Sequence, residues 1–581
     1  MSSKGKSLKT YILACRREWV IGVMLVLASV LMSVGIPFIT RFAIDDLNEG
    51  IISVGGVIFY SAAYVIAAAV SGVFAFKMRR VLLSLSHHVE YDIRRDVFDH
   101  LTRLDHSFYS RERTGDLMTK MTSDLTSVRE FVGQGILQGA RTIFGFVLAF
   151  AVMLAINVRL AMVMLILLPC ISLLFFMLLN VIRRRYEASQ EQFSVISNFS
   201  QESFGGVRTI RGYGMEDRQE GLFAGLNGEY IARKLALSRV ERPLWPIMSM
   251  LFSLGVVLLL IVGGRQVVDG DLTIGEFVQF TQYLFLLQWP MMALGWTVNL
   301  MQRGGASWRR IRSIMDSEPA IRDGDQTDSS IMLRTGAVSF ELVNLMMRGM
   351  HVLKDITLDI PDGATVGLTG PTGSGKTLLA WMIPRVIEPT SGLVRVDGHN
   401  VRSIPVEKLR LHIGMAPQEP FLFSDTLANN IALGLPETHQ EKVFWAADIA
   451  QLSSDIEYFP GGYQTVLGER GVTLSGGQRQ RTAISRAIAR KPPILILDDV
   501  FSAIDTQTEA NILERLGPVL KGSTSIIVSH RISTLRHADF IVVLENGRIT
   551  QKGPHRDLVR QTGYYQELDE VQRLESELEG V

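Results

Sequence analysis

The stretch GPTGSGKT, residues 370–377, decides the fold of the C-terminal half of the chain. It fits the pattern G-x-x-x-x-G-K-[ST], follows the apolar run 365–368 and precedes a helical stretch that begins at Leu378. Glycines in such a loop let backbone N–H groups converge on phosphate oxygens, and the helix N-terminus adds partial positive charge. The stretch therefore predicts a phosphate-binding loop between a strand and a helix, at the centre of an α/β domain.

The residue types in this P-loop indicate ATP and Mg²⁺ as cofactors. Lys376 would reach the β- and γ-phosphates, and the Thr377 hydroxyl would hold Mg²⁺. Further along, the run ILILD ending at Asp498 is typical of a buried strand with a terminal carboxylate, which would lie beside Mg²⁺. A core strand with a capping aspartate is the alternative. The expected nucleotide-binding residues of the loop are Gly370, Thr372, Gly373, Ser374, Gly375, Lys376 and Thr377.

Hydropathy divides the rest of the chain. Its 581 residues exceed what one core usually holds, and nearly all the long apolar runs lie before residue 303. We expect a membrane domain over 1–302, a polar linker over 303–336 and an α/β domain over 337–581, where short β-branched runs alternate with helical stretches. The segments long and apolar enough to span a bilayer are 19–41, 52–76, 137–157, 159–182, 245–267 and 276–301.

Charged residues between these segments predict their orientation. Short acidic loops join the first and third pairs, whereas the long connections 77–136 and 183–244 are dense in arginine and lysine. The positive-inside rule places these connections and both termini in the cytoplasm, in a multi-pass protein of the cell (inner) membrane. A cleaved signal peptide is the rival interpretation, but the first apolar run, 19–40, is too long for one.

The long connections also show helical periodicity and few loop signals. This pattern predicts that the membrane helices continue well beyond the bilayer and turn back near 108–118 and 213–218. Such tips would press on a cytoplasmic domain, with solvated hairpins as the alternative.

A C-terminal helix is predicted over 564–578, with packing favoured over partner binding as the reason for its apolar stripe. The stripe consists of Leu568, Val571, Leu574 and Leu578.

Charge and cysteine content argue against two classes of protein. With 59 basic and 58 acidic residues the net charge is +1, so nothing favours nucleic acid as a partner. The two cysteines, Cys15 and Cys170, are too few for a disulfide framework.

The stretch LSGGQ, ending at Gln478, precedes an arginine-rich helical segment. Here the chain resembles the ATPases of ABC transporters, in which this signature binds the γ-phosphate of the ATP held by a partner domain. The chemistry agrees, because a serine hydroxyl and two glycine amides at a helix N-terminus form an anion site. The resemblance makes Ser475, Gly476, Gly477 and Gln478 expected nucleotide-binding residues.

Other family features match in order and spacing. Gln418 resembles the glutamine that senses nucleotide and faces the membrane domain, which makes it an expected catalytic residue and an Mg²⁺ ligand with Thr377 and Asp498. The segment GERG at 468–471 resembles one that is specific to exporters. Asp505 resembles the aspartate of the D-loop, an expected nucleotide contact. His530 resembles the switch histidine, an expected catalytic residue at the γ-phosphate.

The resemblance covers essentially the whole chain. It implies a half-transporter of the ABC exporter class: an all-α domain of six transmembrane helices with long cytoplasmic extensions, followed by a P-loop α/β ABC ATPase domain. The implied activity is ATP hydrolysis coupled to transport. In that family, ATP binding closes two ATPase domains and the membrane helices switch from opening on one side of the membrane to opening on the other. Hydrolysis then resets them.

Asp499 departs from the family pattern. Most members have glutamate directly after the aspartate that corresponds to Asp498 (the Walker B aspartate), as the base that orients the attacking water. An aspartate carboxylate falls roughly 1–1.5 Å short, and a misplacement of about 1 Å can cost around a hundredfold in rate. We expect Asp499 to be a catalytic residue of a site that binds ATP and hydrolyses it poorly.

Met347 is the second departure. Alignment of residues 338–345 with the family places Met347 where an aromatic side chain normally stacks on adenine. Methionine can cover a ring face with its polarizable sulfur, but the usual stacking is lost.

In the family that this chain resembles, each ATP lies between the P-loop of one chain and the signature of the other. Both departures therefore belong to the site built on this chain's own P-loop, whereas the signature, which serves the other site, is intact. This combination resembles the degenerate-site subunit of heterodimeric bacterial multidrug exporters of the Mdl type. It predicts a second half-transporter chain as partner. A homodimer with two slow sites, a homodimeric lipid flippase, and an ATP-gated or regulatory membrane protein with little turnover are the alternatives.

The sixth apolar segment offers a candidate surface for the transported substrate. Its Phe285, Trp289, Met292, Trp296 and Asn299 fall close to one helix face, with Gln282 and Gln288 nearby. A face rich in methionine, aromatic and amide groups suits hydrophobic or amphipathic drugs, lipids or peptides, while ordinary packing or lipid contact is the alternative.

Overall fold

The computed structural model of the chain describes residues 6–324, 326–435, 439–468, 471 and 474–579. The chain forms two compact units. A helical unit consists of Met1–Arg103 and Glu112–Glu318, and an α/β unit consists of Leu104–Arg111 and Pro319–Val581.

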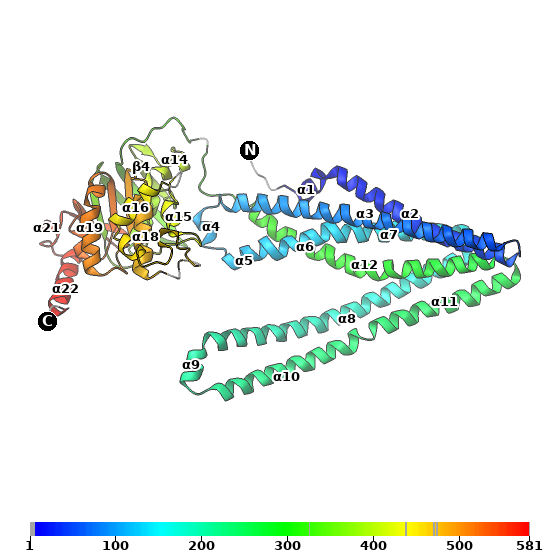
Figure 1. The fold of residues 1–581 in the computed structure, drawn as a ribbon. Helices are drawn as coiled ribbons and strands as arrows, with labels where there is room; N and C mark the ends of the chain where they lie inside the picture. Colours follow the sequence, from blue (N-terminus) through cyan, green and yellow to red (C-terminus); the bar gives the residue numbers. More distant parts are fainter. Residues whose placement is uncertain (1–5, 325, 436–438, 469–470, 472–473, 580–581) are drawn as a thin grey trace. The chain divides into compact units, whose positions relative to one another are not determined.

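Long helices make up the helical unit (Figure 1). Two π-helical stretches, Lys120–Asp124 and Phe131–Gly135, interrupt the run from α5 to α7. The helices are α1 (Leu8–Ala14), α2 (Arg16–Asn48), α3 (Val54–Leu101), α5 (Thr114–Thr119), α6 (Leu125–Glu130), α7 (Ile136–Ile156), α8 (Val158–Gly205), α9 (Val207–Gly212), α10 (Glu216–Glu241), α11 (Leu244–Asp269) and α12 (Ile274–Met315).

Six helical runs in the described part of the chain are long and apolar enough to cross a membrane, and each overlaps one predicted span. The predicted all-α membrane domain is therefore confirmed. Helices α3 and α8 have 48 residues each, whereas a bilayer needs only about 20. The surplus is the predicted helical extension. Figure 1 shows α8 and α10 side by side, with α9 joining them at one end.

Small residues and buried polar groups hold the helices of this unit together. A Cβ on Gly22 would lie 2.5 Å from Leu82 Cδ2, so this glycine lets the Leu82 side chain pack directly against α2. Asp124 is 3% exposed and accepts hydrogen bonds of 2.9 Å from Ser307 Oγ and from Arg310 Nε. The buried carboxylate is thereby paired and hydrogen-bonded.

Helix α12 extends further than the sequence suggested. It ends at Met315, so the predicted linker over 303–336 begins inside this helix. Ile311 and Ile314 are each 1% exposed and lie three residues apart, on one face of the helix. Burial of that face explains why a stretch with polar composition is helical.

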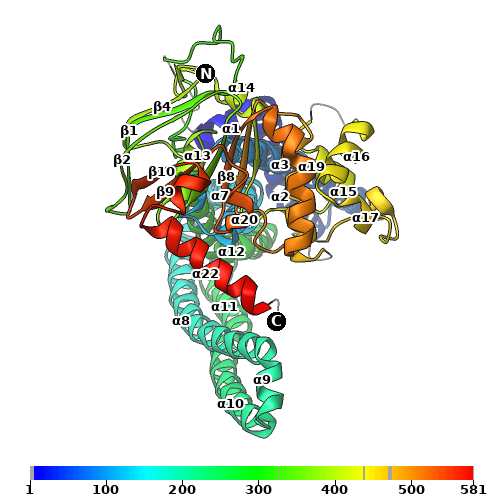
Figure 2. The ribbon, with the colours of Figure 1, turned by 90° about the vertical axis from the view of Figure 1, so that its left-hand side faces the viewer.

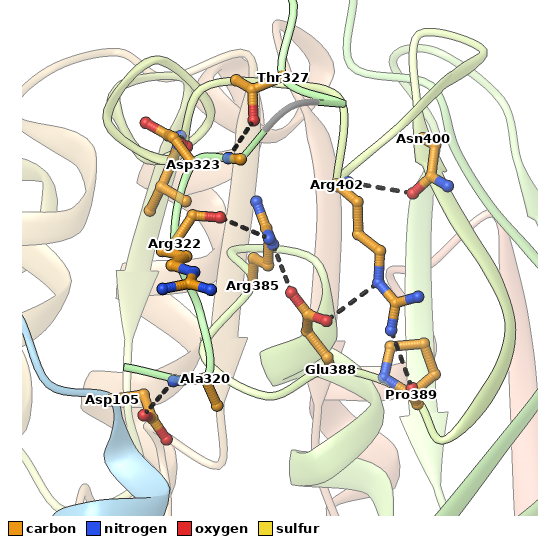
Figure 3. A network of polar contacts seen from close by, with 12 residues as sticks. Asp105, Ala320, Arg322, Asp323, Thr327, Arg385, Glu388, Pro389, Asn400 and Arg402 are labelled. Atoms are coloured by element: carbon orange, nitrogen blue, oxygen red, sulfur yellow. Dashed lines mark hydrogen bonds and ion pairs between the residues drawn. The ribbon is translucent and has the colours of Figure 1, made fainter. Parts of the chain in front are cut away.

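The irregular segment after α12 is fastened to the α/β unit (Figure 3). Asp105 Oδ1 accepts a hydrogen bond of 2.9 Å from the Ala320 N–H. Arg385, which is buried, donates from Nη2 to the Arg322 carbonyl over 3.2 Å and from Nε to Glu388 over 2.7 Å. The α/β unit also includes Leu104–Arg111, and so the first residues of the turning point predicted near 108–118. Residues 108 and 109 of this turning point form the end of the short helix α4 (His106–Tyr109).

The α/β unit alternates strands and helices. In chain order its elements are α4 (His106–Tyr109), β1 (Val338–Met347), β2 (Met350–Ile360), β3 (Thr365–Thr369), α13 (Lys376–Met382), β4 (Ser391–Val396), β5 (His399–Asn400), α14 (Val406–Leu411), β6 (Ile413–Ala416), α15 (Leu427–Ala432), α16 (Gln440–Ile449), α17 (Ser453–Ile456), a 3₁₀ turn (Gly462–Gln464), α18 (Gly476–Ile488), β7 (Ile494–Asp498), α19 (Thr506–Lys521), β8 (Thr524–Val528), α20 (Ile532–Leu535), β9 (Phe540–Glu545), β10 (Arg548–Gly553), α21 (His555–Leu558) and α22 (Tyr564–Glu579).

Two sheets organise this unit. Strands β2-β1-β4-β5 form an antiparallel sheet, and β10-β9-β3-β8-β7-β6 form a second sheet that is parallel except at β10. In Figure 2, β1, β2 and β4 lie on the left and α15–α17 on the right. Because β3, β8, β7 and β6 are adjacent and parallel, the segments that follow them emerge at one edge of the sheet. That edge carries the candidate site.

The predicted C-terminal helix is present as α22. Its first turn is anchored by Tyr565, which is 0% exposed. Val571, Leu574 and Leu578 are 52%, 50% and 78% exposed, so packing within this chain does not explain the later part of the apolar stripe, contrary to prediction.

Candidate nucleotide site

The P-loop follows β3, in which all five residues are buried. Gly370, Gly373 and Gly375 have φ angles of 139°, 82° and 102°, which side-chain-bearing residues rarely adopt. A Cβ on Gly370 would lie 2.0 Å from the Leu544 carbonyl oxygen, and one on Gly375 would lie 2.6 Å from Leu353 Cδ2. Steric exclusion and backbone conformation both require glycine at these two positions.

Lys376 begins α13 and is 7% exposed. Its Nζ donates hydrogen bonds of 2.8 Å to the Gly370 carbonyl and 3.0 Å to the Pro371 carbonyl. Burial holds its pKa below the ordinary value, and the Asp499 and Asp498 carboxylates oppose this shift. A buried ammonium whose hydrogen-bond partners among the described residues are two carbonyl oxygens is suited to receive an anionic phosphate.

Asp498 ends β7 and is 1% exposed. Thr377 Oγ1 donates to Asp498 Oδ1 over 3.1 Å. Burial raises the pKa of Asp498, the neighbouring Asp499 adds to the shift, and the Thr377 hydrogen bond opposes it. A bound cation would reverse this shift by favouring the charged carboxylate.

The donor set fits Mg²⁺. Ser374 Oγ is buried, and no described residue forms a hydrogen bond with it. Thr377 Oγ1 and Asp498 Oδ1 lie 3.1 Å apart. No group of three or more His, Cys, Asp and Glu side chains in the described ranges could hold a metal by itself. Mg²⁺ prefers octahedral oxygen ligands and is usually bound through one or two protein groups together with substrate phosphates. The residues therefore fit a cation that is held jointly with a nucleotide.

Asp499 directly follows β7 and has a φ of 48°, in the left-handed region. Its backbone N–H donates to the Val528 carbonyl over 2.9 Å, and its Oδ2 accepts a hydrogen bond of 3.1 Å from Gln418 Nε2. Burial raises the pKa of Asp499, while His530 and the Gln418 hydrogen bond lower it. Gln418, which follows β6, thus contacts the carboxylate that follows β7.

His530 follows β8 in the same row of strand ends. Burial lowers its pKa, Lys376 lowers it further, and Asp499 opposes the shift. The imidazole is therefore mainly neutral at neutral pH.

Sites for small ligands usually measure about 300–1,000 Å³, and the cavity at this edge of the sheet measures ≈ 360 Å³. It brings together residues predicted from four separate motifs. Leu378 and Val528 also line it, although no motif singled them out, because a buried strand end and a helix start carry no distinctive signal. Its lining is Thr372, Gly373, Gly375, Lys376, Thr377, Leu378, Gln418, Asp498, Asp499, Val528 and His530.

The signature residues lie elsewhere in the α/β unit, at the start of α18. Ser475 is the N-cap, and its Oγ accepts a hydrogen bond of 3.2 Å from the Gln478 N–H, while Gln478 Oε1 accepts one of 3.0 Å from the Ser475 N–H. A Cβ on Gly477 would lie 3.1 Å from the Ala503 carbonyl oxygen. This capping box leaves the amides of Gly476 and Gly477 at the helix N-terminus, and none of the four signature residues lines the cavity.

Gly370 and Ser374 of the P-loop are not part of the cavity lining, and neither are two other predicted residues, Asp505 and Met347. Asp505 is exposed and caps α19, where its Oδ1 accepts a hydrogen bond of 2.9 Å from the Thr508 N–H. Met347 is the last residue of β1, just before a tight turn, and is 37% exposed. Glu469 and Arg470 of the predicted exporter segment lie outside the described residues.

Two family models match the chain. The model described as the ABC transporter transmembrane region matches residues 19–291, and the model described as ABC transporter matches residues 353–502.

Curated relatives match over nearly the full length. The chain is 33% identical over 570 residues to the multidrug resistance-like ATP-binding protein MdlA of Escherichia coli, covering 97% of this chain and 96% of that protein. It is 32% identical over 583 residues to the probable multidrug resistance ABC transporter ATP-binding/permease protein YheI of Bacillus subtilis, covering 100% and 99%. Among solved structures, a bacterial Atm1-family ABC exporter with ATP bound has a TM-score of 0.81 at 25% identity, covering 96% of this chain and 99% of that one.

Proposed function

The chain belongs to the ABC transporter family, as an ATP-binding half-transporter of the multidrug exporter type. We propose that it pairs with a different half-transporter, and that the ATP site built on its own P-loop (the slow site) hydrolyses ATP slowly. ABC exporters work as dimers in a membrane. A second half-transporter would complete two composite ATP sites. This chain would supply the P-loop of the slow site and the signature of the efficient one.

The observation that carries the proposal is Asp499. It occupies the position of the general base, and its carboxylate is already engaged by Gln418 over 3.1 Å. A base must lie within hydrogen-bond reach of the water that it orients, and aspartate reaches less far than glutamate. Slow hydrolysis at this chain's own site follows from that shorter reach.

The P-loop and the remaining cavity residues support nucleotide binding at the same site. Gly370, Thr372, Gly373, Ser374 and Gly375 would surround the phosphates with backbone N–H groups, and Lys376 would pair with the β- and γ-phosphates. Mg²⁺, when bound, neutralises charge on the phosphate oxygens. It would be held by Thr377, Asp498 and Gln418. His530 would face the γ-phosphate with a neutral imidazole.

The remaining predicted nucleotide contacts are divided between the ATP bound by this chain and the ATP bound by the partner. Met347 would cover one face of the adenine of this chain's ATP. Ser475, Gly476, Gly477, Gln478 and Asp505 would contact the ATP held by the partner. The position of the signature at the N-terminus of α18, with Ser475 as N-cap, supports its role as an anion site for a phosphate of that ATP.

We place the protein in the cell (inner) membrane with both termini in the cytoplasm. The long arginine-rich connections are part of helical extensions that carry α9 and α4. The positive-inside rule supports a cytoplasmic location for these extensions. Outward transport then starts from the cytoplasm or the inner leaflet.

The substrate is proposed to be hydrophobic or amphipathic. A cavity of ≈ 430 Å³ lies between α8, α10 and α12, and it includes Trp296 and Asn299 from the predicted helix face. Gln282 lines a different cavity, between α2 and α3. Aromatic side chains with a few amide and charged groups suit amphipathic ligands. The side chain of Met292 lies outside the described residues.

Trp296→Ala is expected to weaken the response to a stimulating drug. Loss of a large aromatic side chain from a binding cavity costs on the order of 2 kcal/mol, or roughly thirtyfold in affinity. The measurement is the drug concentration that gives half-maximal stimulation of ATPase activity. Trp289→Ala is the matched control, since Trp289 lies on the same helix, is 59% exposed and does not line the cavity. Equal shifts in the two variants would contradict this cavity as the drug site.

The proposed function is tested by measuring ATP turnover of this chain purified alone and co-purified with its partner half-transporter. We expect little turnover alone and brisk turnover in the pair, abolished when the partner's general base is changed from glutamate to glutamine. Brisk turnover by the isolated chain would mean that Asp499 is a competent base and would overturn the slow-site assignment.

A further inference from the structure

The C-terminal helix α22 makes a specific contact with the backbone that carries His530. Gln572 Nε2 donates a hydrogen bond of 2.6 Å to the His530 carbonyl, and Gln572 Oε1 accepts one of 2.9 Å from the Ile532 N–H. Arg531 between them has φ −98° and ψ 126°, an extended conformation. In an extended backbone, the carbonyl of one residue and the N–H two residues later point to the same side. One carboxamide therefore pairs both groups, as a neighbouring strand would.

Burial of the first turn of α22 fixes which face of the helix Gln572 occupies. Tyr565 is fully buried, and its hydroxyl lies 2.8 Å from His555 Nδ1. It packs in a cluster with Leu535 and Ile541, which flank the segment after His530. Residues 565 and 572 are seven positions apart, close to two helical turns, so they lie on the same face. The anchor at Tyr565 thus directs Gln572 at the His530 backbone.

The opposite side of the same segment is held by Arg531. Its Nη1 donates to the Ile504 carbonyl over 3.0 Å and pairs with Glu509, which is 1% exposed. Glu509 also accepts a hydrogen bond of 2.9 Å from Ser533 Oγ. The backbone around Arg531 is therefore attached to α19 through charged groups and to α22 through Gln572.

The His530 imidazole itself has no hydrogen bond to the described residues. It faces the cavity, where Lys376 and Asp499 act on it only through their charges. Its position therefore depends on the backbone that carries it. Any displacement of the His530 carbonyl moves the imidazole relative to the cavity.

We propose that Gln572 is a positioning residue for ATP hydrolysis, which acts by holding the His530 backbone so that the imidazole faces the γ-phosphate. The inference rests on the role proposed for His530, but it is independent of the assignment of Asp499 as a poor base. Glutamine is suited to this position because one side chain must supply both a donor and an acceptor. Glutamate lacks the donor, and methionine of similar length lacks both groups.

The test is steady-state ATP hydrolysis by the full chain purified alone, measured as phosphate release at varied ATP for Gln572→Met and Gln572→Glu. Both variants are made in the natural sequence and in the Asp499→Glu background. We expect kcat to fall about tenfold in each variant, since misplacement of a catalytic group by less than about 1 Å has effects of this order. The KM for ATP and the binding of a fluorescent ATP analogue are expected to stay unchanged, because the P-loop is not touched.

Glu570→Ala is the matched control, since Glu570 is exposed on the same helix. It is expected to leave kcat unchanged. Gln572→Glu keeps the acceptor for the Ile532 N–H but sets a carboxylate oxygen against the His530 carbonyl. Full activity in this variant would overturn the proposal, as would a loss matched by Glu570→Ala or a loss confined to KM. The proportional loss is expected in both backgrounds, so failure of Asp499→Glu to raise turnover would count against the slow-site proposal alone.

Discussion

Gly477→Asp is expected to lower ATP turnover of the assembled heterodimer by ~100-fold or more, because its carboxylate would repel the phosphate at the anion site, an effect as large as losing one preorganised anion-binding group. Lys376→Ala in the same chain is expected to leave most of the turnover in place. The difference arises because Gly477 would complete the efficient site, whereas Lys376 belongs to the slow one. Phosphate release by the purified pair measures both effects.

The structure makes Gly477→Asp a usable probe. An aspartate in the first turn of α18 favours the helix, because its charge complements the helix dipole. Its Cβ would lie 3.1 Å from the Ala503 carbonyl oxygen, a contact that requires only a small adjustment. The same carboxylate repels a phosphate at the anion site formed by the helix N-terminus. A thermal melting curve close to that of the natural sequence is the control for folding, and equal losses in Gly477→Asp and Lys376→Ala would contradict the asymmetric arrangement.

Asp499→Glu is expected to raise ATP turnover of the isolated chain by on the order of 10- to 100-fold. The added methylene extends the carboxylate toward the position of the attacking water, beyond the contact that Gln418 now makes over 3.1 Å. Phosphate release by the purified chain without its partner is the measurement.

Asp499→Asn is the control for this gain, since it keeps the size of the side chain and removes its basicity. It is expected to be no faster than the natural sequence. Unchanged turnover in Asp499→Glu would show that the length of this side chain does not limit the rate. The slow-site assignment would then fail, while the nucleotide-binding roles of Lys376 and Thr377 would stand.

The cavity could be anticipated from sequence because its residues follow strands. Runs such as ILILD end in a polar residue where the buried strand reaches the edge of the sheet, and parallel strands end at one edge. Asp498 ends such a run, and Lys376 and His530 follow one. The pattern at each strand end therefore predicted that residues far apart in the sequence lie together at one edge of the sheet.

The contact of Gln572 had no such signal. It depends on how α22 packs after Tyr565 is buried, which is a tertiary property. Ile311 and Ile314 likewise made the end of α12 helical through burial that composition did not reveal. For the same reason, residues of α8 such as Phe176, which line the cavity beside Trp296, were not singled out.

The α/β unit is not continuous in sequence, because it combines Leu104–Arg111 with Pro319–Val581. Asp105 and Ala320, joined by one hydrogen bond, are 215 positions apart in the chain. A gene fragment that begins at Pro319 would omit Asp105 and His106. The Ala320 N–H would lose its acceptor, and the Trp381 ring would lose its edge contact with His106 at a centroid distance of 5.1 Å. Exchange of ATPase domains between exporters by recombination at this junction would therefore separate the transferred domain from the short segment Leu104–Arg111, which packs as part of it.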